Sequence, residues 1–394
     1  MKNKLFVVCL ILSFLMITNI DVHAAKYSDI KNNCFWEDYV CYHIVGKNEV
    51  EPFLIDSEYG ESKEYWYPTN GELITPKEDV VLSIPSTVDH NGISYTITRM
   101  PDYKASGVTF DPKYEISISI LDPGYYEEPS FIKNYMDYMT YSGLGGHPIN
   151  SLNGVTHLIL PNTLEHIGNG SLAYYSNLKI IDFPTNYEFI TFGDNVFIEN
   201  SLKKIVIPEG TYKLGTASLG KISEVSLPKS LKKIGDYVIN SSMNKITLAK
   251  GNRYFKITNG IMYSKDGGIL YGVSAKAPSK ITILKAVKEI RPCAFAYSKV
   301  KEIKFKGKYL NFINKGTFLG CINLTKISGL KEVKGIEYAA FSGCPKLKSF
   351  SNLKVNDYIS IAAFWDSKKP KFKIDTTATV KKYAFKRPKI TGED

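Results

Sequence analysis

Residues that build catalytic and nucleic-acid-binding sites are scarce in this sequence. It holds 6 histidines in 394 residues, and no two histidines or cysteines have H-x-x-x-H or C-x-x-C spacing. Such spacings are typical of metal sites. Only four of its 50 basic residues are arginine, the side chain best suited to phosphates and base edges. We therefore expect no metal, no cofactor, no nucleic-acid partner and no enzymatic activity.

Long hydrophobic runs are absent after the N-terminus. Lys2 and Lys4 precede an almost unbroken apolar run from Leu5 to Ile17, and small residues follow it. This order is typical of a signal peptide, which we place at residues 1–25. The run is too short for a membrane-spanning helix, and no later stretch reaches the necessary length. We expect an exported chain without a transmembrane segment, at the cell surface, outside the cell or in a periplasm.

Charge is distributed unevenly along the chain. Residues 26–150 hold 9 Lys/Arg and 20 Asp/Glu, a balance of −11, whereas residues 151–394 hold 39 and 18, a balance of +21. Regions of opposite charge have different surfaces and attract one another. The sequence therefore predicts an acidic region at 26–150 and a basic region at 151–394.

A six-residue motif, apolar–x–x–x–small–apolar, recurs through the basic region. Its starts lie 20 to 25 residues apart, except for one gap of 56 residues. The copies of this hexamer are Ile167–Leu172, Phe192–Phe197, Leu214–Leu219, Ile234–Ile239, Ile290–Phe295, Ile313–Phe318, Ile336–Phe341, Ile359–Phe364 and Val380–Phe385. A period of this length indicates a solenoid, in which each repeat buries its apolar face against its neighbours.

Each repeat also carries a strand signal. After the hexamer Phe192–Phe197 and a polar turn, Leu202 to Pro208 reads Leu-x-x-Ile-x-Ile-Pro. Alternating apolar residues predict a strand, and the proline ends its ladder of hydrogen bonds. The fifth hexamer residue is always small or β-branched, which predicts a close backbone approach between neighbouring coils.

At this point the sequence resembles a known family. Residues 313–324 (Ile-Asn-Lys-Gly-Thr-Phe-Leu-Gly-Cys-Ile-Asn-Leu) and 336–347 (Ile-Glu-Tyr-Ala-Ala-Phe-Ser-Gly-Cys-Pro-Lys-Leu) are similar to BspA-like leucine-rich repeats. The resemblance covers residues 151–394, and a segment at about 250–283 is similar to a hairpin-like insertion between such repeats. Residues 80–98 are weakly similar to the family's leading strands.

The resemblance implies both a fold and a role. The fold is a leucine-rich-repeat solenoid, mostly β with short helical turns, in a curved stack behind an N-terminal β-rich cap. The role is that of an exported bacterial adhesin or protein-binding module, whose ligand is a protein or an acidic glycan of a host matrix or cell surface. Oligomeric state is left open.

One candidate site lies on the exposed face of the repeat strands. On Leu-x-x-Leu-x-Leu spacing, the x residues project away from the core. These residues include Lys179, Asp182, Lys203, Lys204, Glu224, Lys245, Lys301, Glu302, Lys304, Lys326 and Lys348. The excess of lysine has two interpretations: a basic strip that binds an acidic partner, or a solvated face that keeps the protein soluble.

A second candidate site is the Tyr-rich segment 103–150. Tyr125 and Tyr126 lie there among acidic residues, and tyrosine gives a large contact area at low entropic cost. The segment is either a binding loop or a cap on the open end of the solenoid. If these tyrosines and Trp66 form a platform, the alternative function is that of a cell-surface carbohydrate-binding accessory protein.

The remaining hypotheses concern cysteine and histidine. Cys34 and Cys41 are close in sequence in a chain expected to be exported, which predicts a disulfide. Three later cysteines, two of them in the same repeat register, are predicted to be buried thiols: Cys293, Cys321 and Cys344. A second alternative function is an enzyme within 26–150, which requires convergence of a carboxylate with His43, His90 or His147.

Overall fold

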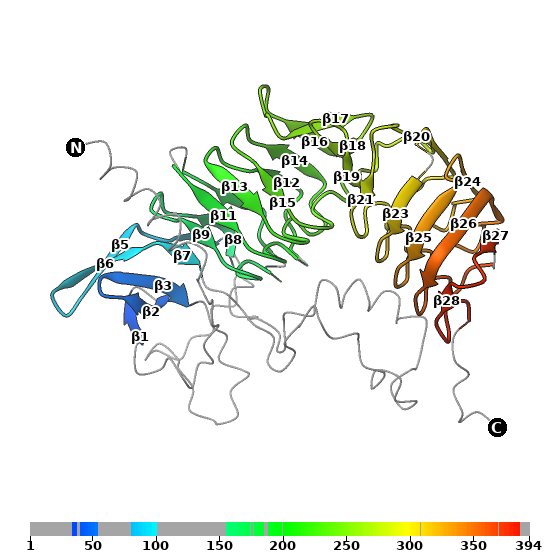
Figure 1. Cartoon of the computed structure of the whole chain (residues 1–394). Helices are drawn as coiled ribbons and strands as arrows, with labels where there is room; N and C mark the ends of the chain where they lie inside the picture. The colour runs from blue at the N-terminus through cyan, green and yellow to red at the C-terminus, as the bar shows by residue number, and fades with distance from the viewer. Residues whose placement is uncertain are drawn as a thin grey trace, which may run out of the picture.

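The chain folds as a β-solenoid, seen here in a computed structural model (Figure 1). The structure describes residues 34–37, 40–53, 80–100 and 155–386, apart from 174, 176, 185–187, 199, 308 and 369. These residues form strands and turns and no helix, so the short helical turns expected from the resemblance are non-helical turns. The described part of the chain therefore contains no helix that could cross a membrane.

Each coil places one strand in each of two parallel ladders. The first ladder consists of β4(Val80–Ser83), β8(Val155–Ile159), β10(Ile180–Asp182), β12(Lys204–Val206), β14(Glu224–Leu227), β16(Lys245–Leu248), β20(Lys280–Ile283), β22(Glu302–Phe305), β24(Lys326–Ser328), the first part of β26(Ser349–Ile359) and β27(Lys371–Ile374). Among the described residues, its hydrogen bonding is interrupted between β10 and β12 and between β16 and β20.

The second ladder follows the first around each coil. It consists of β7(Arg99–Met100), β9(His166–Ile167), β11(Ile190–Phe192), β13(Thr211–Leu214), β15(Lys233–Ile234), β19(Ile269–Val273), β21(Glu289–Ile290), β23(Tyr309–Ile313), β25(Glu332–Ile336), the second part of β26 and β28(Thr379–Val380). Figure 1 shows the coils stacked side by side in a curved row.

The hexamers form the turn that completes each coil. Their fourth residue has a positive φ, between 50° and 65°, in all nine copies: Gly170, Asn195, Ala217, Tyr237, Cys293, Gly316, Ala339, Ala362 and Tyr383. The turns also bond from coil to coil, since the Phe318 amide donates to the Ala340 carbonyl at 2.8 Å. The fifth residues, such as Ala340, are at most 2% exposed. The predicted close approach of the backbones is therefore confirmed.

A column of phenylalanines fills the core of the later coils. The sixth hexamer residues stack from coil to coil, with ring centroids 5.1 Å apart for Phe295 and Phe318, 5.0 Å for Phe318 and Phe341, and 5.2 Å for Phe341 and Phe364. The earlier coils have Leu219 and Ile239 at this place, and both are fully buried. Burial of these side chains is the main stabilising term of the stack.

An inserted hairpin divides the core in two. Strands β17(Phe255–Thr258) and β18(Ile261–Ser264) pair in antiparallel fashion between β16 and β19, so the 56-residue gap contains an additional coil. Successive side chains of β18 face opposite sides: Met262 belongs to a cluster that begins at Val50, and Ile261 to a cluster that ends at Ala384. The hairpin is therefore a partition between two halves of the solenoid.

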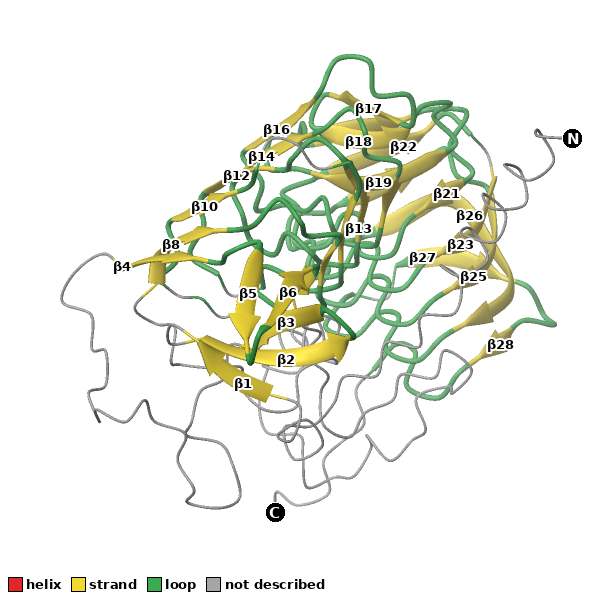
Figure 2. Ribbon diagram, turned by 90° about the vertical axis from the view of Figure 1, so that its left-hand side faces the viewer, coloured by secondary structure: helices red, strands yellow, loops and turns green. Residues whose placement is uncertain are grey.

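A second sheet lies at the N-terminal end of the stack (Figure 2). It has the order β1(Cys34–Glu37), β2(Val40–Gly46), β3(Glu49–Phe53), β6(Ile93–Ile97), β5(Thr87–His90). Val50, Val88 and Ile97 join the first core cluster. The ladders already begin here, because β4 pairs with β8 and β7 with β9.

Candidate functional site

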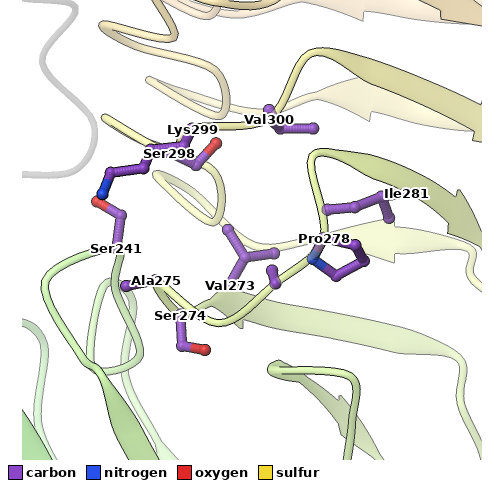
Figure 3. Close-up of a pocket in the computed structure, with 10 residues that line it drawn as sticks. Ser241, Val273, Ser274, Ala275, Pro278, Ile281, Ser298, Lys299 and Val300 are labelled. Carbon is purple, nitrogen blue, oxygen red and sulfur yellow. The ribbon is translucent and has the colours of Figure 1, made fainter.

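The seam between the two halves of the solenoid contains a small cavity (Figure 3). It has a volume of about 10 Å³, and Ser241, Ser274 and Ser298 line it together with apolar residues such as Val273 and Val300. A space of this size holds roughly one water molecule. It is too small for a substrate.

Titratable residues near the seam serve the structure. Arg291 Nε donates to Asp236 Oδ1 at 2.7 Å, and its Nη1 lies 3.0 Å from Glu289 Oε1. Burial raises the pKa of Asp236 above its ordinary value, although the charge of Arg291 opposes that rise. The ion pair thus connects turns on either side of the inserted coil.

Histidines of the described residues do not assemble a catalytic centre. His157 Nε2 lies 2.7 Å from Asp182 Oδ2, His166 Nδ1 contacts the Thr191 hydroxyl at 2.8 Å, and His90 contacts Asn91. No nucleophile bonds to His157 in the described part of the chain, and no three metal-binding side chains gather there. The side chain of His43 and all of His147 lie outside the described residues.

The later cysteines are buried thiols, as predicted. The Cys321 thiol donates to the Phe295 carbonyl at 3.0 Å, and the Cys344 thiol donates to the Phe318 carbonyl at 3.1 Å. Burial raises the pKa of Cys293 to about 12. These thiols satisfy backbone carbonyls of the turn, so their contribution is structural.

A disulfide was predicted between Cys34 and Cys41. The structure describes the backbone of these two residues but not their side chains. In the register of β1 and β2, Cys34 lies opposite His43, and Cys41 lies opposite Trp36. The two cysteines are therefore diagonal neighbours, and their disulfide stays a prediction.

The residues of the predicted lysine strip lie on the first ladder and just before its strands. Nine of the eleven are exposed, and Glu224 and Glu302 are half-buried. The register places Glu224 between Lys204 and Lys245, and Glu302 between Lys280 and Lys326. Opposite charges on neighbouring strands attract one another. The strip is therefore a row of alternating charge at these strands, not a row of lysines alone.

One ion pair of this row is in direct contact. Lys280 Nζ lies 2.8 Å from Glu302 Oε1, and its hydrogen bond holds the pKa of Glu302 below the ordinary value. Lys203, Lys301, Lys304 and Lys348, at other positions of the strip, are exposed. The other predicted site, with Tyr125 and Tyr126, lies outside the described residues.

A different group of side chains, at the second ladder, was not predicted from the sequence. Tyr212 of β13 lies at the centre of what we call the Tyr212 cluster, which also contains Phe189, Lys232, Lys233 and Tyr254. These residues come from four successive coils. Phe189, Tyr212, Lys232 and Lys233 lie just before or within second-ladder strands, and Tyr254 lies just before the hairpin strand β17.

Comparisons with known proteins agree with this architecture. A family profile described as BspA type Leucine rich repeat region matches six copies, over residues 150–261 and 274–391. The crystal structure of the pneumococcal vaccine antigen PcpA is similar, with a TM-score of 0.52 and 16% identity over 90% of this chain and 91% of that chain. None of the curated proteins matches the sequence.

Two further crystal structures have lower scores. A leucine-rich repeat protein from Eubacterium ventriosum has a TM-score of 0.42 and 16% identity, over 78% of this chain and 90% of its own. A leucine rich cell surface protein from Faecalibacterium prausnitzii has a TM-score of 0.41 and 14% identity, over 86% and 94%. At these identities the likeness to PcpA is informative about the fold alone.

Proposed function

The chain belongs to the BspA-type leucine-rich-repeat family, and we propose on this basis that it is a non-enzymatic interaction protein. Its partner is a macromolecule that contacts several coils at once. Solenoids of this kind present extended surfaces, because every coil repeats the same outward positions.

The observation that carries the proposal is the exposure of side-chain rows on both ladders. On the first ladder, Lys204, Glu224 and Lys245 are in register on three strands, and Lys280, Glu302 and Lys326 on three more. These rows give a ligand many weak polar contacts at regular spacing. Such contacts add up only for a partner that is itself long or wide.

Export and adhesion complete the proposal. The leader-like residues 1–25 support export, although they lie outside the described residues. The expected ligand is a protein or acidic glycan of a host matrix or another cell surface. A function in carbohydrate binding through Tyr125, Tyr126 and Trp66, and an enzymatic site within 26–150, stay predictions for residues that are largely outside the description.

The test is binding of the full chain to immobilised extracellular matrix proteins at low and high ionic strength. The matched variant carries Lys203→Gln, Lys204→Gln and Lys304→Gln, and we call it the first-ladder variant. Glutamine is preferred to glutamate because Lys204 lies opposite Glu224, where a second carboxylate would repel the first.

We expect saturable binding that weakens as salt rises, since exposed charges are screened over about 10 Å at 0.1 M salt. If the first ladder carries the ligand, the first-ladder variant binds more weakly. If wild-type chain binds none of the matrix proteins at either salt concentration, the adhesion proposal fails.

A further inference from the structure

We propose that the Tyr212 cluster is a binding site for an anionic polysaccharide, with its aromatic rings against the sugar rings and its lysines against sulfate or carboxylate groups. This inference rests on the proposed function and adds a location and a ligand class. The first observation behind it is geometric. The rings of Phe189 and Tyr212 have centroids 5.2 Å apart, and Lys232 Nζ lies 5.1 Å from the Tyr212 centroid and 5.9 Å from that of Tyr254.

The rings are open to solvent. Phe189 is 46% exposed and Tyr254 is 43% exposed, both unusual for large apolar side chains in a stack that buries most of its aromatics. Between them, Tyr212 is half-buried and holds the cluster in place on β13. A ligand whose sugar rings cover these aromatic side chains removes their apolar surface from water.

The positive charges of the cluster and of the neighbouring Lys213 are unbalanced. Lys213 and Lys233 are direct register partners on β13 and β15, and like charges in that position repel. Lys233 Nζ also lies 5.5 Å from the Tyr212 centroid. Within the described residues, no ion pair joins Lys213, Lys232 or Lys233 to a carboxylate, not even to the exposed Glu188 beside Phe189.

The first ladder and this part of the second ladder differ in their pattern of charge. On the first ladder, Glu224 and Glu302 each lie between lysines of the neighbouring strands, and Glu302 forms an ion pair with Lys280. At the second ladder, the ammonium groups of Lys232 and Lys233 both lie near the Tyr212 ring, without an ion-paired carboxylate in the described structure. An anionic group of a ligand would offset this positive charge, and the cation–π contacts with Tyr212 already hold both ammonium groups beside the ring.

Backbone pairing favours a glycan over a peptide. Strands β11 and β13 are bonded on both sides, β11 to β9 and β13, and β13 to β11 and β15. A peptide therefore cannot add beside β11 or β13 as a further strand, which is a common way to bind extended peptides; β15 is an edge strand of this sheet. Recognition at β11 and β13 therefore relies on rings and ammonium groups, and sugar rings with acidic substituents match both.

The test compares the full chain with two variants and the first-ladder variant. The second-ladder variant carries Lys213→Gln, Lys232→Gln and Lys233→Gln, so it loses the same charge as the first-ladder variant. The ring variant carries Phe189→Ser and Tyr254→Ser and keeps all lysines. The probes are heparin as a sulfated polysaccharide, dextran as a neutral one and polyglutamate as an acidic polypeptide. Circular dichroism and the unfolding midpoint check that each variant is folded.

We expect heparin to bind the wild-type chain, and the second-ladder and ring variants to bind it at least about tenfold more weakly. The first-ladder variant should change heparin affinity by less than about twofold. Dextran should not bind.

Three outcomes overturn the inference. Heparin affinity that falls equally in both lysine variants, and not in the ring variant, shows binding by overall charge. Polyglutamate that binds as tightly as heparin, with no effect of the ring variant, indicates an acidic protein as the partner. Binding of matrix proteins without any binding of heparin refutes this site alone, whereas a chain that binds neither also refutes the proposed function.

Discussion

At the scale of single residues, the second hexamer position shows how tightly the turns stack. In the first half of the solenoid it is occupied by glycine, for example Gly193, Gly215 and Gly235. A Cβ atom added to Gly215 would lie 2.4 Å from the carbonyl oxygen of Gly193. In the second half the same position has side chains, such as Ser360. At this hexamer position, a backbone contact too close for a side chain is thus a property of the first half.

We predict that Gly215→Ala lowers the free energy of unfolding by about 1–3 kcal/mol, because the added methyl group must displace backbone of the neighbouring coil. Urea unfolding followed by circular dichroism measures it. Ser360→Ala is the control, at the equivalent position in the second half, and should change stability by no more than about 0.5 kcal/mol. Equal shifts in the two variants would refute the close contact.

The buried thiols predict a pattern of chemical reactivity. Cys293, Cys321 and Cys344 are at most 1% exposed, so iodoacetamide at pH 8 should leave them unmodified in the native chain and modify them in denaturant. Peptide mass spectrometry reads each cysteine separately.

The raised pKa of Cys293, about 12 against 9.0, also predicts that its contribution to stability is complete below pH 9 and is lost as the pH rises toward 12. Rapid modification of Cys293 in the native chain would contradict its burial.

The sequence predicted burial correctly for residues whose size or polarity favours the interior. The small fifth hexamer residues predicted close packing, and the cysteines predicted burial. The left-handed fourth residues were not foreseen, because only Gly170 and Gly316 among the nine are glycine and the others are imposed by the stack.

At the scale of elements, the phenylalanine column connects the coils of the second half. Phe318 stacks between Phe295 and Phe341, with interplanar angles of 31° and 11°. We predict that Phe318→Ala destabilises the protein by about 3–5 kcal/mol, through lost burial and the cavity that remains. Phe318→Leu should cost less, because Leu219 occupies the same position in the first half. Thermal unfolding ranks the two variants, and a smaller effect of alanine than of leucine would refute the packing.

The inserted hairpin makes a prediction about each half separately. Met262 faces the first core cluster and Ile261 the second, although they are adjacent on β18. Met262→Ala should therefore increase amide hydrogen exchange mainly in β12, β14 and β16, and Ile261→Ala mainly in β20, β22 and β24. Each truncation should cost about 2–5 kcal/mol. If both variants loosen the same strands, β18 is no partition between the clusters.

The sequence resemblance indicated a hairpin in this segment but not its place in the core. Antiparallel pairing follows from two strand signals around a Gly-containing turn at Asn259 and Gly260. Both faces of β18 are buried because a coil packs against each face. The local pattern of apolar residues does not show which coils are neighbours in space. The additional coil with β16 and β19 was hidden for the same reason.

At the scale of the whole molecule, the solenoid was predictable because its hexamer motif recurs nine times in the sequence. The charge of its surface was only partly predictable. Composition showed an excess of lysine, but only the strand register reveals that the first ladder alternates charge while Lys213 and Lys233 face one another on the second. Strand register depends on where each coil begins and ends. Because the repeats vary in length from 20 to 25 residues, the sequence leaves these boundaries uncertain by several residues.

In the function proposed above, this solenoid binds a macromolecular partner through charged and aromatic side chains on its exposed ladders. The most direct measurement is an equilibrium binding isotherm of the full wild-type chain on the panel of matrix proteins and heparin, recorded at low and high ionic strength. We predict saturable binding to at least one ligand, weakened at high ionic strength because exposed charges are screened. If the chain shows no saturable binding to any of these ligands at low ionic strength, where attraction between charges is strongest, the proposed function is wrong.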